Sequence, residues 1–322
     1  MAVRTLRASR AGILVTVLAV LAGAAGELLA TQPLPVDELA PGVFVHQGRH
    51  QPWAATDADD VANLGFVVGS DCVAVIDTGG SPATGAALLA SIRAATPRPV
   101  CYVINTHVHP DHILGNPAFA ALEPRPRFVA HARLPASLAA RAPFYLHALG
   151  RDTGATAGAP AFPAYEILVD DSLTLELGDV RLHLRAWQTA HTDNDLSVHV
   201  PERGVVFLGD LLFSTHLPVI DGRLLGWLAV MDALSGPNGG LAGHLVVPGH
   251  GHPTSEWAHA FARQHEYLAL VRDRTRQAIA EGRGIAETVE ALAGTGIEGW
   301  LLADDFHRRN LTAAFAELEW ED

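Results

Sequence analysis

The chain has 322 residues, enough to bury a substantial core in one large domain or in two small ones. Hydrophobic residues make up 49% of the sequence, and there is no low-complexity stretch or short-period repeat, as is typical of a globular protein. The net charge is −13 with the histidines neutral, which argues against a nucleic-acid-binding surface.

The N-terminal residues differ from the rest of the chain. Arg4, Arg7 and Arg10 precede an apolar run over residues 11–26, and the small residues at 22–24 fit a cleavage site. The run is too short to span a bilayer comfortably. We therefore predict that residues 1–26 are a signal peptide and that the mature protein is periplasmic or secreted, without a stable membrane span. The alternative is an uncleaved N-terminal anchor.

We expect residues 27–322 to form a single domain. Strand-like runs occur at residues 42–48, 63–69 and 72–77. Ser81 and Pro82 then predict a helix start, because serine caps a helix and proline suits its first position. This helix should end before Pro97, and the continuously apolar residues 99–106 read as a buried parallel strand. Strand, helix and strand make a βαβ unit, and α/β folds place their sites at the carboxyl ends of such strands.

The second half of the chain repeats this organisation. A strand at residues 127–131 and a helix at 132–149 precede a loop at 150–164, two hairpins turning at 178–179 and 202–204, a helix at 224–234, a strand at 244–250 and helices from 255 onward. We predict an α/β (α+β) fold in which two sheets lie face to face with helices outside, a four-layer αββα sandwich. Its core should span about residues 36–284, with a helical C-terminal tail packed on the outside.

Cys72 and Cys101 lie in two strand-like runs that could be neighbours. An exported protein can form disulfides, so a bridge between them is one interpretation, and two small buried hydrophobic side chains is the other. Neither cysteine lies among the candidate metal ligands described next, which argues against a thiolate metal site.

Three histidines and an aspartate gather in "THVHPDH", residues 106–112, where the strand 99–106 ends. His107 and His109 are two residues apart and point the same way from an extended chain, so they can bind one ion. Asp111 and His112 follow a turn at Pro110 and point to a second position. The full H-x-H-x-D-H pattern at a strand end predicts a metal site.

Three later residues repeat this placement. His191 follows a strand, Asp210 ends the run "VVFLGD", and His250 ends "LVVPGH". All three could converge with the first cluster on one rim, which gives enough ligands for two ions. Histidine and carboxylate without thiolate favour Zn²⁺, with Fe or Mn not excluded.

The segments "THVHPDH", "AHTDND", "LGD" and "PGHG" resemble the metallo-β-lactamase-fold hydrolase superfamily over roughly residues 43–252. More narrowly, "THVHPDHILGNPAF", "HARLP", "TAHTDNDLSV" and "GDLLF…H.P.IDG…GWL" resemble the quinoprotein relay system zinc metallohydrolases. Those exported proteins are associated with PQQ-dependent quinoprotein dehydrogenases, so the resemblance implies a link to such a pathway.

The superfamily resemblance implies a role for each motif residue, with a glyoxalase-II-like ligand set. His107, His109 and His191 would hold one zinc ion, Asp111, His112 and His250 a second, and Asp210 would bridge them. Asp77, at the end of "VAVID", would support the site from behind the ligands.

The expected chemistry is hydrolysis of a small ester, thioester, lactone or amide. Two zinc ions would share a water whose pKa falls toward about 7, and the resulting hydroxide would attack the substrate. Asp111 and Asp210 are the expected catalytic residues, and Asp111 would orient the nucleophile.

Three alternatives stay open. Metallo-β-lactamases generally carry cysteine or serine where this chain has Asp210, which argues against a dedicated β-lactamase without excluding β-lactam amide hydrolysis. Persulfide dioxygenases share much of the ligand pattern but bind a single iron. The third alternative is a metal-bound accessory protein that serves a quinoprotein pathway by binding and not by turnover.

Five further residues are weaker candidates. His216 could face the substrate, and His50 with Trp53 could form a flap over it. Asp195, like its neighbour Asp193, could orient His191 through a hydrogen bond or could form the local turn.

Overall fold

The computed structural model describes residues 31–52, 59–153, 162–237 and 239–321. The predicted signal peptide and Trp53 lie outside the described residues. Residues from Thr31 onward fall into one compact unit. Among the described residues, no helix is long and apolar enough to cross a membrane.

The first half of this unit builds a seven-stranded sheet in the order β1-β2-β3-β4-β5-β6-β7. Its strands are β1 (Asp37–Ala40), β2 (Val43–His46), β3 (Leu64–Val68), β4 (Val73–Ile76), β5 (Val100–Ile104), β6 (Arg127–His131) and β7 (Ile167–Val169). The pairs from β1 to β4 are antiparallel, and those from β4 to β7 are parallel. The predicted βαβ unit is thus β4, α1 (Pro82–Ala95) and β5. Ser81 caps α1 as predicted, since its hydroxyl accepts a hydrogen bond from the Thr84 amide at 3.1 Å.

The second half builds a five-stranded sheet in the order β12-β11-β10-β9-β8. Its strands are β8 (Ser172–Glu176), β9 (Arg181–Ala186), β10 (Leu196–Val200), β11 (Val205–Phe213) and β12 (Leu245–His250). Both predicted hairpin turns are present, at Gly178 (φ 98°) and Gly204 (φ 64°), where glycine supplies the left-handed backbone. The parallel pair β11–β12 is connected through α5 (Leu224–Ser235).

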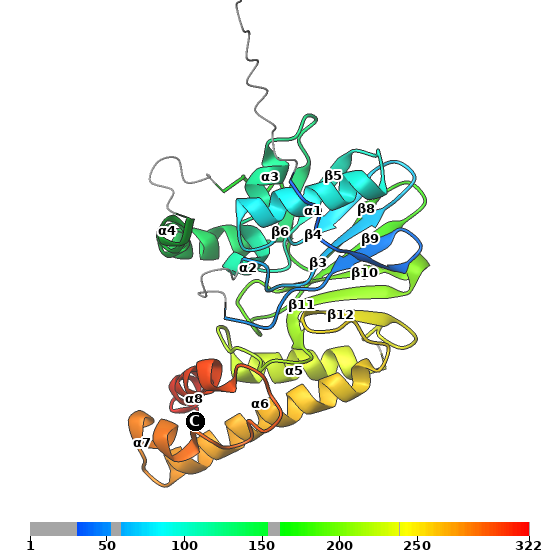
Figure 1. Ribbon diagram of the computed structural model, residues 1–322. Coiled ribbons are helices and arrows are strands. Elements are labelled where there is room, and N and C mark those ends of the chain that lie inside the picture. Colours follow the sequence, from blue (N-terminus) through cyan, green and yellow to red (C-terminus); the bar gives the residue numbers. More distant parts are fainter. Residues whose placement is uncertain (1–30, 53–58, 154–161, 238, 322) are drawn as a thin grey trace, which may run out of the picture. The chain divides into compact units, whose positions relative to one another are not determined.

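The described chain is layered as helices, sheet, sheet and helices, and this confirms the predicted αββα sandwich (Figure 1). Apolar residues such as Ile76 and Phe207 fill the space between the two sheets. Leu88 of α1 and Phe119 of α3 (Asn116–Ala120) cover the outer face of the first sheet. The outer face of the second sheet packs against α5, α6 (Trp257–Ala280) and α8 (Ala303–Leu318). β11 is buried along its whole length because it is covered on both faces.

The remaining described helices are α2 (Pro110–Ile113), α4 (Leu134–Thr153) and α7 (Ile285–Leu292), with a 3-10 turn at Pro201–Arg203. The tail after residue 284 is helical, as predicted. Its position differs in one respect, because α8 also reaches the functional site described below.

Cys72 and Cys101 form a disulfide, with 5.8 Å between their Cα atoms. The bond joins the start of β4 to the neighbouring strand β5, at the end of these strands away from the histidine cluster. Of the two interpretations that the sequence left open, the structure contains the bridge.

Candidate metal centre

The metal-binding candidates converge because strands of both sheets end at one edge. His107 and His109 follow the end of β5, His191 follows β9, and His250 ends β12. Asp210 lies in β11 directly after Gly209, whose φ of 53° and close approach to Thr106 require a residue without a side chain. Residues far apart in the sequence are therefore brought to one place, as the strand-end pattern predicts.

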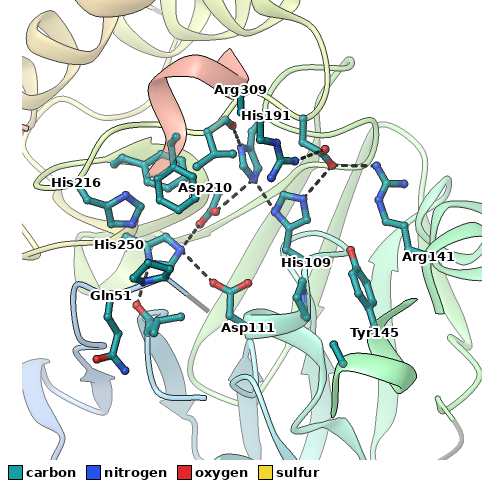
Figure 2. A pocket seen from close by; sticks show the side chains of 18 of the residues that line it. Gln51, His109, Asp111, Arg141, Tyr145, His191, Asp210, His216, His250 and Arg309 are labelled. Atoms are coloured by element: carbon teal, nitrogen blue, oxygen red, sulfur yellow. Dashed lines mark hydrogen bonds and ion pairs between the residues drawn. The ribbon is translucent and has the colours of Figure 1, made fainter. Parts of the chain in front are cut away.

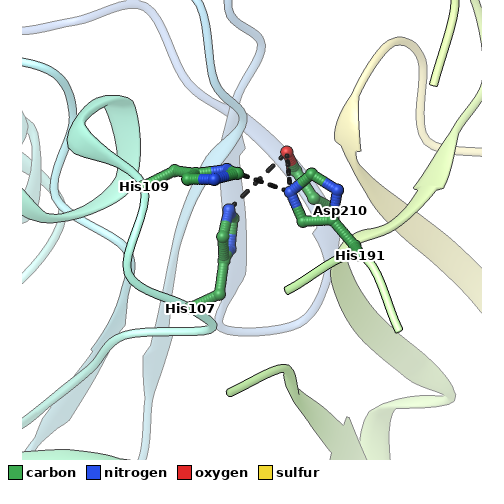
Figure 3. Close-up of side chains that lie close together, drawn as sticks. All are labelled: His107, His109, His191 and Asp210. Carbon is green, nitrogen blue, oxygen red and sulfur yellow. Dashed lines mark hydrogen bonds and ion pairs between the residues drawn. The ribbon is translucent and has the colours of Figure 1, made fainter. Parts of the chain in front are cut away.

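His107, His109, His191 and Asp210 form the first group, in which the potential ligand atoms all lie within 4.8 Å of one another (Figure 3). His191 Nε2 lies 3.2 Å and His107 Nε2 3.6 Å from Asp210 Oδ2. His109 Nδ1 lies 3.0 Å from His191 Nε2. Three imidazoles and one carboxylate oxygen thus point at one centre, which suits a tetrahedral zinc site.

Asp111, His112 and His250 form the second group, also within 4.8 Å of one another. His250 Nε2 lies 3.3 Å from Asp111 Oδ2. The other oxygen of Asp210, Oδ1, lies 3.2 Å from His112 Nε2 and 3.4 Å from His250 Nε2. Asp210 therefore lies between the two groups and directs one oxygen to each.

The chemistry of these side chains fits metal ions. His107 Nε2, His112 Nε2 and Asp210 Oδ1 are buried and have no hydrogen-bond partner among the described residues. A buried polar atom without a hydrogen-bond partner lowers the free energy of unfolding by about 1–3 kcal/mol, and here three such atoms lie in one cluster. Coordination to metal ions would satisfy all three, because each atom carries a lone pair directed at the centre of its group.

The two carboxylates are held in the charged form that a metal ligand needs. Burial raises the pKa of Asp111, but the charges of His112 and His250 outweigh burial and lower this pKa to about 2. Burial opposes ionisation of Asp210 as well, yet His250 and His112 hold the pKa of Asp210 well below its usual value. Burial, followed by the charge of His112, lowers the pKa of His107 well below its usual value, which keeps that ring neutral.

Asp77 supports the second group from behind, at the position that the sequence suggested. Its Oδ2 accepts a hydrogen bond from His112 Nδ1 at 2.8 Å and from the Thr106 hydroxyl at 2.7 Å. Its Oδ1 accepts from the Thr106 amide at 2.8 Å. This network fixes the His112 tautomer and leaves Nε2 free to face the centre.

Backbone carbonyls orient two other histidines. His191 Nδ1 donates to the Val219 carbonyl at 2.7 Å, and His250 Nδ1 donates to the Val61 carbonyl at 2.9 Å. Asp195 makes no hydrogen bond to the His191 ring. Its carboxylate instead accepts from the Thr192 amide at 2.9 Å and from the Thr192 hydroxyl at 2.6 Å. The prediction that Asp195 orients His191 directly is corrected to the alternative role of forming the turn.

Asp221, together with two arginines, is part of the site that the sequence did not indicate. Asp221 Oδ2 accepts a hydrogen bond from His109 Nε2 at 3.0 Å, which leaves Nδ1 of that ring facing the first group. Arg141 of α4 and Arg309 of α8 donate to the same carboxylate at 3.0 and 2.7 Å. Asp221 lies in the "IDG" of the narrower resemblance, but this segment carries no ligand spacing and its partners lie up to 112 residues away, so the sequence assigned it no role.

A cavity of about 700 Å³ opens beside the two groups (Figure 2). Asp111, His191, Asp210 and His250 line it, and so does His216, one of the predicted substrate contacts. The described lining does not include His50, whose ring centre lies 6.0 Å from that of His216. Phe306 and Arg309 of α8 line the cavity, so the C-terminal tail does more than cover the outside.

Two sheets packed face to face between helices, with a His/Asp cluster at the strand ends, define an α/β sandwich that could hold metal ions at one edge. Residues 58–272 match the family profile described as the metallo-beta-lactamase superfamily, and the chain belongs to this superfamily. This confirms the broader resemblance drawn from the motifs. Among curated proteins, none matches the sequence.

Solved structures share the fold at low sequence identity. The sec-alkylsulfatase Pisa1 from Pseudomonas sp. superposes with a TM-score of 0.67 at 15% identity, over 89% of this chain and 51% of that one. A double mutant of PisA1 gives 0.68 at 16% identity, with the same coverage of both chains. A metallo-beta-lactamase from Pontibacter korlensis gives 0.59 at 18% identity, over 73% of this chain and 99% of that one. The present chain thus spans about half the length of the alkylsulfatases, and the likeness extends to the fold alone.

Proposed function

We propose that this hydrolase binds two zinc ions and cleaves a small ester, thioester, lactone or amide. The placement of Asp210 is the observation that carries the proposal. Its Oδ2 lies 3.2 Å from His191 Nε2 in one group, and its Oδ1 lies 3.2 Å from His112 Nε2 in the other. A carboxylate that directs one oxygen to each of two groups of imidazoles suits a pair of ions, with His107, His109 and His191 holding one and Asp111, His112 and His250 the other.

Two bound zinc ions would lower the pKa of a water toward about 7 and polarise the electrophilic centre of the substrate. The protein's own residues supply orientation. Asp111 lines the cavity and stays anionic, so it can accept a hydrogen bond from the attacking water and aim it at the substrate. Asp77, Asp221 and two backbone carbonyls hold the histidine rings in fixed tautomers, which keeps the site ready before substrate arrives.

The cavity limits what can be bound. Its volume of about 700 Å³ suits a small molecule, and Phe144, Tyr145 and Phe306 give it an apolar wall beside the polar cluster. This wall suits an apolar substrate body. The presence of Asp210 where metallo-β-lactamases generally carry cysteine or serine places β-lactam amides second among the candidate substrates.

Elemental analysis of the purified mature protein is the decisive experiment. The proposal expects two zinc ions per chain, fewer in Asp210→Ala, and an unchanged number in Asp273→Ala, which removes a carboxylate from the exposed surface. Esters, thioesters, lactones, β-lactams and, because of the fold likeness, sulfate esters are then screened for hydrolysis. One iron per chain would instead favour persulfide dioxygenase chemistry.

We further propose that residues 27–322 are a single exported domain that acts beside a PQQ-dependent dehydrogenase. The basic and apolar N-terminal segment, the Cys72–Cys101 bridge and the motif resemblance to the quinoprotein relay hydrolases support this. Cell fractionation and the mass of the mature N-terminus test export. Co-purification with a quinoprotein dehydrogenase tests the pathway link. If His109→Ala keeps full pathway function, the protein acts there by binding and not by turnover.

A further inference from the structure

Asp221 joins the metal-binding cluster to two arginines. Its Oδ2 accepts from His109 Nε2 and from Arg141 Nη2, both at 3.0 Å, and its Oδ1 accepts from Arg309 Nη2 at 2.7 Å. Three donors therefore converge on one carboxylate, which uses most of its capacity as an acceptor. Each guanidinium carries five N–H groups, and each gives one of them to Asp221.

The two guanidinium groups therefore carry more N–H donors than the neighbouring carboxylates accept. Asp193 is the next carboxylate that acts on Arg141, but its oxygens accept from the Ser137 hydroxyl at 2.6 Å and from the Asn194 amide at 2.7 Å. Arg141 and Arg309 both line the cavity, with 30% and 54% of their side chains exposed. Figure 2 shows both guanidinium groups on the His109 side of the cavity, with Gln51 across it. Their remaining N–H groups are thus available to a molecule that enters the cavity.

The position of Arg309 is fixed by the fold. Asn310, fully buried, accepts from the Ile220 amide at 2.9 Å and donates to the Pro218 carbonyl at 2.6 Å. These two hydrogen bonds hold the helix that carries Arg309 against the segment that carries Asp221. α8 lies outside residues 58–272, the part of the chain that matches the family profile.

We propose that Arg141 and Arg309 form a subsite for an oxyanion on the substrate, a carboxylate or a sulfate carried at the end of a short apolar body. Arginine forks bind such groups through paired, charge-assisted hydrogen bonds. Phe144, Tyr145 and Phe306 line the same cavity and suit the apolar body. This inference rests on the proposed hydrolase function, since it specifies which substrates the two-ion site would cleave.

A matched pair of esters tests the subsite. The 4-nitrophenyl monoester of glutaric acid carries a free carboxylate, and 4-nitrophenyl butyrate has the same reacting ester without it. Arg141→Gln and Arg309→Gln each keep an amide donor for Asp221 but remove the charge. We expect each to raise KM for the glutarate ester about tenfold to a hundredfold more than KM for the butyrate ester, because any effect that acts through Asp221 and the ions changes both esters alike. Equal changes for both esters, or none, would overturn the subsite.

Arg308→Gln is the matched control. It removes the same charge from the same helix, but Arg308 pairs with Glu290 on the exposed surface and does not line the cavity. Elemental analysis of every variant checks that the ions are retained, because Asp221 contacts both arginines and His109. If a glutamine variant loses ions, the same pair of esters is measured with Arg309→Lys. Lysine keeps the positive charge but lacks the paired N–H donors of the guanidinium group.

Calorimetric titration of the metal-loaded protein keeps the subsite testable if no ester is hydrolysed. Glutarate and inorganic sulfate are the probes. If Arg309→Gln binds glutarate more weakly than the wild-type protein does but binds sulfate equally well, the subsite is specific for a carboxylate. If it binds both probes more weakly, the subsite accepts oxyanions in general. Equal affinities in the wild-type protein and Arg309→Gln would reject it, whatever the outcome of the hydrolysis screen.

Discussion

Asp77 accepts a hydrogen bond from His112 Nδ1 at 2.8 Å while its own backbone adopts a left-handed conformation, with φ of 59°. Few residues other than glycine adopt this conformation, and asparagine and aspartate do so with the least penalty. The strained backbone places the carboxylate under His112, between the end of β4 and the metal-binding loop. The residue thus serves both the turn and the histidine.

Asp77→Asn separates these two roles, because asparagine tolerates the same backbone but carries no charge. We expect zinc affinity to fall about tenfold to a hundredfold, since the His112 ring loses the partner that raises its basicity and fixes its tautomer. Competition with a chelating dye measures this, and circular dichroism checks the fold. Asp71→Asn, at an exposed carboxylate a few residues earlier, should leave the affinity unchanged. An unchanged affinity in Asp77→Asn would show that the carboxylate acts on the backbone alone.

Gly249 lies against Asp210. A Cβ at this position would stand 1.9 Å from Asp210 Oδ1 and 2.8 Å from the Asp210 amide nitrogen, so Gly249→Ala must displace the carboxylate or the strand. We expect fewer than two ions per chain, with metal affinity about fivefold to 150-fold weaker, as overpacking by about 1–3 kcal/mol implies. Gly294→Ala adds the same methyl group where no atom lies within 4 Å and serves as the control. Elemental analysis compares them, and full occupancy in Gly249→Ala would contradict the expectation.

The Cys72–Cys101 bridge closes a loop with a sequence separation of 29 residues. Removing it by a double substitution to alanine should lower the free energy of unfolding by about 3–4 kcal/mol, mainly through the greater freedom of the unfolded chain. Urea unfolding measures the difference, and reduction of the wild-type protein should reproduce it. Zinc content should not change, since neither cysteine is near the cluster. Free thiols in the protein purified under oxidising conditions would refute the bridge.

His199 makes the folded protein sensitive to acid at a place far from the metal-binding cluster. Burial, followed by the charge of His244, lowers the pKa of His199 to about 4, and the two Nε2 atoms lie 2.9 Å apart. In the unfolded chain this histidine becomes protonated below about pH 6.5, whereas in the folded protein it becomes protonated only near pH 4. Unfolding is therefore favoured as the pH falls through this window.

His199→Gln should therefore lose less stability than the wild-type protein between pH 6.5 and 4. We expect a difference of about 1–2 kcal/mol at the acid end, allowing for the partial exposure of the ring. Urea unfolding at several pH values measures it. His147→Gln, at an exposed histidine, should follow the wild-type curve. If both variants and the wild-type protein lose stability in parallel, the His199 ring is not the acid-sensitive group.

The strands and the two groups of side chains were predictable because their signals are local. His107 to His112 share one short motif, and His191, Asp210 and His250 each follow an apolar run, so strand direction alone brings them to one edge. The sandwich was predicted from the order of the strands and helices, which the spacing of hydrophobic residues indicates. The disulfide stayed open at the level of sequence, because pairing of β4 with β5 depends on the sheet and not on either run alone.

The parts that escaped prediction depend on contacts between distant segments. Asp221, Arg141 and Arg309 come from a loop and two helices. Arg141 and Arg309 belong to no motif, and the motif that contains Asp221 gave no role for it. Asp195 was assigned to His191 because they are close in sequence, but the turn directs its carboxylate to Thr192 and gives His191 the Val219 carbonyl. Proximity along the chain is a poor guide to hydrogen bonding in a loop, where backbone direction changes at each residue.

The binding of Asn310 to Pro218 and Ile220 has a consequence for the wall of the cavity. Every residue of the two His/Asp groups lies between positions 107 and 250, whereas Phe306 and Arg309 come from the last helix. The cavity wall thus combines residues from within this range, such as Arg141 and Tyr145, with residues from the last helix. A substitution at Phe306 changes the wall that a substrate contacts without altering any residue of the two groups.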